Sequence, residues 1–121
     1  MNENISPKVQ NQLAMLQQIQ QQLQMVASQK SQFEIVVRES NKAIEELNDV
    51  ADDAEVFMTV GSVIVQKDRD YVVTSLNERV ELLEIRIKSL EKQEKAFQSK
   101  YEDLSAQIKA ALEKQSPGAA I

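Results

Sequence analysis

The chain lacks the side chains that most often carry out chemistry in proteins. Its 121 residues include no His and no Cys, so the commonest general base and the thiol nucleophile are both absent. Zinc would have to be held by carboxylates alone, which is unusual. The only glycines are Gly61 and Gly118, too few for the glycine-rich loops that hold phosphates or dinucleotides. We therefore expect no enzyme, no catalytic residues and no cofactor.

An acidic cluster near the middle of the chain is the one candidate cation site. It consists of Asp49, Asp52, Asp53 and Glu55. Its spacing does not match the calcium-binding loop of an EF-hand, in which alternating ligands surround a central glycine. A solvated connector between two structural elements is the simpler interpretation, and we expect no metal here.

Charge and hydropathy exclude several kinds of partner. The formal net charge is −5, whereas binding to nucleic acid or to anionic lipid needs a basic face. No apolar run approaches the ~20 residues that span a bilayer. The polar start of the chain, Met1 to Asn4, has no signal-peptide pattern. We expect a cytoplasmic protein that binds neither nucleic acid nor membrane.

Two heptad stripes occupy most of the chain and predict two long helices, over residues 6–48 and 68–114. Ser6-Pro7 and Asp68 are suitable helix starts, and Ser116-Pro117-Gly118 marks a stop before a tail at 115–121. Each helix of roughly 40 residues would be about 60 Å long. The positions of the stripes, mostly apolar, are Val9, Gln12, Leu16, Ile19, Leu23, Val26, Lys30, Phe33, Val37, Ser40, Ile44 and Leu47, then Val73, Leu76, Val80, Leu83, Ile87, Leu90, Glu94, Phe97, Tyr101, Leu104, Ile108 and Ala111.

The two stripes match in length, which favours an antiparallel coiled coil within one chain. Val9 would then face Ala111, and Leu47 would face Val73. A parallel homodimer is the alternative, in which each stripe needs a partner from another chain. Two polar residues, Lys30 and Glu94, interrupt the stripes. They either pair and fix the register or stay in water, with the lysine extending outward.

The segment at 49–67 differs from both helices. Glu55 to Val60 and Val63 to Gln66 are rich in β-branched residues and flank Gly61-Ser62, which predicts a short β-hairpin. A continuous helix is disfavoured by the valines and by Gly61. Both faces of these strands are largely apolar, and a lone hairpin is marginal in water. We therefore expect the hairpin to join hairpins of other subunits in a larger sheet or closed β-barrel.

The ends of the two helices form a second unusual region. No charged residue occurs from Val9 to Gln29, and Leu13, Met15 and Met25 lie off the stripe. Such a surface suits loose binding of varied apolar segments, since Met adapts its shape. An ordinary helical surface is the alternative, because single exposed apolar residues are common.

The chain resembles the prefoldin subunits, whose layout is helix, β-hairpin, helix. The hairpin segment Thr59-Val60-Gly61-Ser62-Val63-Ile64-Val65, its approach Asp52 to Phe57, and the N-terminal segment Pro7 to Leu23 carry the resemblance. A single hairpin is similar to the β-type, and the N-terminal and hairpin segments resemble the archaeal β subunit.

The resemblance implies an ATP-independent chaperone built as a hexamer of two α-type and four β-type subunits. Its helix ends capture unfolded proteins and pass them to a group II chaperonin, whose contact with the complex involves the C-terminal ends. The implied client-binding residues are Leu13, Met15, Leu16, Ile108 and Leu112. The implied residues of the assembly platform are Val56, Phe57, Met58, Val60, Gly61, Val63, Ile64 and Val65.

A plain structural coiled coil, acting as a tether or adaptor, is the alternative function. It accounts for the heptads but leaves the valine-rich hairpin and the uncharged helix ends unexplained.

Overall fold

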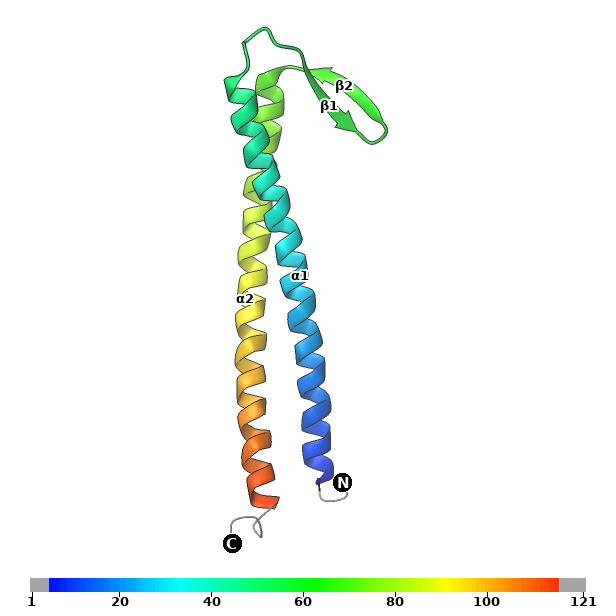
Figure 1. Ribbon diagram of the computed structural model, residues 1–121, viewed down its shortest axis with the longest axis vertical. Helices are drawn as coiled ribbons and strands as arrows, with labels where there is room; N and C mark the ends of the chain where they lie inside the picture. The colour runs from blue at the N-terminus through cyan, green and yellow to red at the C-terminus, as the bar shows by residue number, and fades with distance from the viewer. Residues whose placement is uncertain (1–4, 116–121) are drawn as a thin grey trace. The chain divides into compact units, whose positions relative to one another are not determined.

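The computed structural model describes residues 5–115 and contains four elements in the order helix, strand, strand, helix (Figure 1). They are α1 (Pro7–Asp49), β1 (Val56–Val60), β2 (Val63–Lys67) and α2 (Arg69–Gln115). This confirms the expected fold class of two long helices with a central antiparallel hairpin. Gln115, expected at the start of the tail, is the last residue of α2, and the remainder of that tail lies outside the described residues.

The start of α1 is fixed by a side-chain cap. The amide of Val9 donates to Oγ of Ser6 at 3.2 Å, and the amide of Gln10 donates to the Ser6 carbonyl at 3.0 Å. Ser6 therefore satisfies one of the backbone donors that the first turn leaves free, and Pro7 follows where no donor is needed. At the start of α2, the amide of Val72 donates to the carbonyl of Asp68 at 3.1 Å.

The chain divides into two compact units, each containing part of both helices. The terminal unit consists of Met1–Gln29 and Leu90–Ile121, and the hairpin unit consists of Lys30–Ser89. Lys30 and Glu94 belong to different units, and their pairing stays a prediction.

The terminal unit has an apolar core between its two helical segments. Val9 is 1% exposed, Leu104 8% and Ile108 6%. The residues packed against this cluster are Ile5, Leu16, Ile19 and Ala111. Residues from the start of α1 thus pack against residues from the end of α2, as an antiparallel pairing requires. Every stripe position in this unit is buried or half-buried.

The hairpin unit contains the rest of both helices and the sheet. Its stripe positions are also buried or half-buried, and Val72 and Val80 are both 8% exposed. The strands pair antiparallel, with Val56 opposite Lys67 and Val60 opposite Val63. A two-residue turn, Gly61-Ser62, joins them.

Gly61 determines the type of this turn. Its φ is +60°, whereas Ser62 has no positive φ. A positive φ at the first central residue alone is the signature of a type II′ turn, whose twist matches that of the flanking strands. A Cβ at Gly61 would meet nothing within 4 Å, so glycine is needed for its backbone conformation and not for space.

Candidate interaction surfaces

The hairpin has two apolar faces. Alternation along the strands places Val56, Met58 and Val60 on one face with their partners Val65 and Val63. Exposure on this face rises toward the turn. Val56 is buried, Met58 and Val65 are half-buried, and Val60 and Val63 are 55% and 57% exposed. This face is therefore open at the end nearest the turn.

The opposite face of the hairpin is open along its whole length. It carries Phe57, Thr59, Ile64 and Gln66, all exposed. Phe57 is 56% exposed and Ile64 is 69% exposed. Within residues 5–115, β1 and β2 form a sheet of two strands, so each has one edge without a strand beside it. Large apolar side chains and free strand edges together favour pairing with further strands.

All the residues predicted for the assembly platform lie in β1, β2 or the turn. We call the exposed members Phe57, Val60, Val63 and Ile64 the hairpin surface. Their role in assembly stays a prediction.

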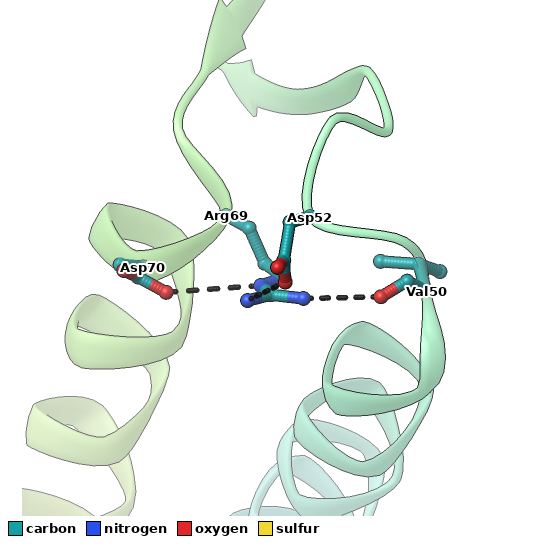
Figure 2. A network of polar contacts seen from close by, with 4 residues as sticks. All are labelled: Val50, Asp52, Arg69 and Asp70. Carbon is teal, nitrogen blue, oxygen red and sulfur yellow. Dashed lines mark hydrogen bonds and ion pairs between the residues drawn. The ribbon is translucent and has the colours of Figure 1, made fainter.

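The connection between α1 and the hairpin is held by Arg69, which sequence reasoning missed (Figure 2). Its Nη1 donates to the carbonyl of Val50 at 3.0 Å, and its Nη2 donates to Oδ1 of Asp52 at 2.9 Å. Its Nε lies 3.7 Å from Oδ1 of Asp70. Because the last turn of α1 has no basic residue, Arg69 supplies the positive charge that a helix C-terminus favours. That absence was the available signal.

The acidic residues beside Arg69 line an open polar groove. It is bounded by the connector, the end of β2 and the start of α2, where Nζ of Lys67 lies 4.9 Å from the centre of the Tyr71 ring. Asp52 is involved with Arg69, and its side chain is 95% exposed. Among the described residues, no three acidic side chains come together in a way that could hold a metal ion.

The terminal unit carries the second exposed apolar surface. Leu13 is 37% exposed, Met15 53% and Leu112 38%. We call these three residues the terminal surface. Two other predicted client-binding residues lie deeper, since Leu16 is half-buried and Ile108 belongs to the core with Val9 and Leu104. The structure thus places Ile108 where it holds the two helical segments together.

Other exposed apolar side chains occur along the helices. Met25 lies in the terminal unit and is 71% exposed. The hairpin unit exposes Ile35 at 44%, Leu82 at 53% and Ile85 at 67%. Within residues 5–115, neither helix contains a stretch apolar enough to cross a lipid bilayer.

Two striped helices joined through a hairpin with apolar faces define a coiled-coil subunit of a larger assembly. Residues 10–115 match the family profile described as prefoldin subunit. Prefoldin subunit beta of Methanoculleus marisnigri is 63% identical over 120 residues, covering 98% of this chain and 99% of that protein. Prefoldin subunit beta of Methanospirillum hungatei is 51% identical over 111 residues, 92% of each chain.

A solved structure agrees with these sequence comparisons. The crystal structure of the prefoldin beta subunit from Thermococcus strain KS-1 matches with a TM-score of 0.82 and 44% identity, covering 89% of this chain and 95% of that one. The chain belongs to the prefoldin family of non-enzymatic chaperones, and its relatives are archaeal β-type subunits. The resemblance seen in the sequence and the expectation of a protein without enzymatic activity are therefore confirmed.

Proposed function

We propose that this chain is one subunit of a cytoplasmic hexameric chaperone, with two α-type and four β-type subunits, that works without ATP. The hairpin surface joins subunits, and the terminal surface captures non-native proteins. The complex then delivers them to a group II chaperonin. The observation that carries the proposal is that two separate sets of apolar side chains are exposed, one on the hairpin and one beside the ends of the helices.

Assembly through the hairpin is supported by what the chain leaves uncovered. Phe57 and Ile64 share a face on which every residue is exposed. A two-stranded hairpin is marginal in water, and pairing with hairpins of other subunits covers both its faces and its edges. A closed barrel satisfies this requirement fully, because it leaves no edge strand.

Capture by the terminal surface is supported by its chemistry. Leu13 and Met15 lie in the segment from Val9 to Gln29, which has no charged residue, so an apolar client meets no unpaired charge there. Each contact is small and therefore weak. Several subunits on one platform raise the effective concentration for a second contact, and avidity can exceed single-site affinity by ~10²–10⁴. Weak contacts also break one at a time, so release needs no nucleotide.

The experiment compares two triple variants in a complex reconstituted with an α-type subunit. The first changes the terminal surface, with Leu13→Gln, Met15→Gln and Leu112→Gln. Gln is close to Leu and Met in helix propensity, so only polarity changes. The matched control replaces Ile35, Leu82 and Ile85, which are similarly exposed residues of the hairpin unit, with Gln.

Light scattering of a thermally unfolding protein, without ATP, measures capture. We expect the terminal variant to need at least about tenfold more complex for the same suppression of aggregation, and the control to match the parent. Equal loss in both variants would move capture away from the terminal surface. A parent complex that assembles but never suppresses aggregation would leave the tether or adaptor as the function.

Delivery is tested by adding a group II chaperonin with ATP to the complex loaded with a fluorescent client. We expect the client to transfer to the chaperonin fraction in native gels. A client that stays with the hexamer would contradict this step.

A further inference from the structure

A polar side chain occupies a stripe position in the terminal unit. Gln12 is half-buried, and the antiparallel pairing places it opposite Ile108 of the core. Its Nε2 donates to Oε1 of Gln107 at 3.3 Å. Its own Oε1 is out of reach of solvent and has no hydrogen-bond partner among the described residues. A buried acceptor without a partner disfavours the arrangement that buries it.

Exchanging the oxygen and nitrogen of this amide does not remove the problem. The flipped amide would direct Oε1 toward Gln107, whose own amide could donate to it. The Nε2 of Gln12 would then take the buried position and lack an acceptor there. Either orientation therefore leaves one polar atom of Gln12 unsatisfied while the two helical segments are together.

Separation of the helical segments removes this cost. Water then reaches both polar atoms of Gln12, and the bond to Gln107 is replaced without loss, since Gln107 is already exposed. The same separation uncovers the core residues Val9, Leu104 and Ile108, which are at most 8% exposed when closed. The site that resists closure thus lies beside the most buried apolar side chains of the unit.

We propose that Gln12 sets how readily the ends of the two helices open, and that the open form offers Val9, Leu104 and Ile108 to an extended apolar segment of a non-native protein. The client-binding step rests on the proposed chaperone function. It returns Ile108 to the client surface, as a residue that is available only after opening.

Hydrogen exchange of the full chain in the reconstituted complex tests the opening step. Exchange of amides in residues 9–16 and 104–111 reports local opening. Gln12→Leu removes the unsatisfied group, and we expect exchange to slow about tenfold or more. Gln107→Ala removes the only partner of Gln12 among the described residues and should speed exchange. Gln17→Leu makes the same replacement at an exposed position of the same helix, so it is the matched control and should change nothing.

Aggregation suppression tests the client step with the same variants. We expect Gln12→Leu to need several-fold more complex than the parent, and Gln17→Leu to need no more. Unchanged exchange in Gln12→Leu would overturn the inference, and so would slower exchange with undiminished capture. A parent complex without any capture would instead overturn the proposed function together with the client step, while exchange would still decide the role of Gln12 in opening.

Discussion

The hairpin surface and the terminal surface both expose apolar side chains, but different arrangements leave them exposed. On the hairpin, strand alternation directs apolar residues to both faces, and the face bearing Phe57 and Ile64 is open throughout. At the helix ends, the stripe residues cover one another, and Leu13, Met15 and Leu112 remain beside the covered stripe. The first surface is continuous, whereas the second consists of separate side chains.

This difference leads to two different kinds of behaviour. A continuous surface with free strand edges favours one permanent partner, because backbone pairing and side-chain burial are gained together. Scattered side chains in a segment without charge favour many short-lived partners, because no single contact buries much area. Substitutions in the hairpin should therefore affect assembly sharply, and those at the helix ends should affect capture gradually.

The largest effect is expected from a charge on the open face of the hairpin. Ile64→Asp places a carboxylate where we expect a subunit interface, and burying an unpaired charge is strongly unfavourable. We expect the dissociation constant for assembly to rise at least about 100-fold, as measured by analytical ultracentrifugation with an α-type subunit. Gln66→Asp, on the same strand and face, is the control and should have a smaller effect. Normal assembly of Ile64→Asp would place the interface elsewhere.

The next effect concerns the core of the terminal unit. Leu104→Ala leaves a cavity beside Val9 and Ile108, and such changes destabilise proteins by ~2–5 kcal/mol. Leu112→Ala, on the surface of the same helix, should change stability by less than about 0.5 kcal/mol. Urea unfolding followed by helical circular dichroism measures both. Similar values would show that the two positions are equally covered, and the distinction between core and surface would fail.

A smaller effect is expected at the hairpin turn. Gly61→Ala forces a residue with a Cβ into a left-handed conformation, which is unfavourable by roughly 1–2 kcal/mol. Because the hairpin must form before it can pair, this corresponds to about a 5–30-fold weaker assembly. Ser62→Ala, at the turn position without a positive φ, should assemble normally. Equal assembly of both variants would argue against the type II′ turn.

The smallest effect is expected at Arg69. Arg69→Ala removes the donor to the Val50 carbonyl and the positive charge at the end of α1, together worth about 1 kcal/mol. Asp52→Asn should lose less than about 0.5 kcal/mol, because Asp52 is highly exposed and exposed ion pairs contribute little. Urea unfolding at low and high salt measures both. A larger loss in Asp52→Asn would show that the ion pair, and not the helix end, is the important contact.

Periodicity predicted most of the fold because it depends only on the spacing of apolar residues. The heptad spacing placed Val9, Leu104 and the other stripe positions at buried or half-buried sites, and the glycine between two β-branched runs located the hairpin. The resemblance to a family assigned Ile108 to the client surface, although its stripe position indicated the core. The stripe position gave the correct burial in the closed state.

The contacts of Arg69 and Gln12 could not be derived in the same way. Arg69 bonds to residues 19 and 17 positions earlier in the chain, and the path of an irregular connector decides which carbonyl it meets. Gln12 bonds across 95 positions to an exposed residue. Its importance depends on the burial of one atom, which no sequence pattern reports.

The open face of the hairpin has a consequence for subunit supply in the cell. A copy of this chain that has found no partner displays Phe57 and Ile64 in water, and exposed apolar strands are what chaperones and proteases recognise in damaged proteins. An orphan copy thus carries the mark of a misfolded protein although its helices are correctly folded. Surplus copies are targets for degradation, so the amount of this chain is limited by the supply of the subunits that complete its sheet.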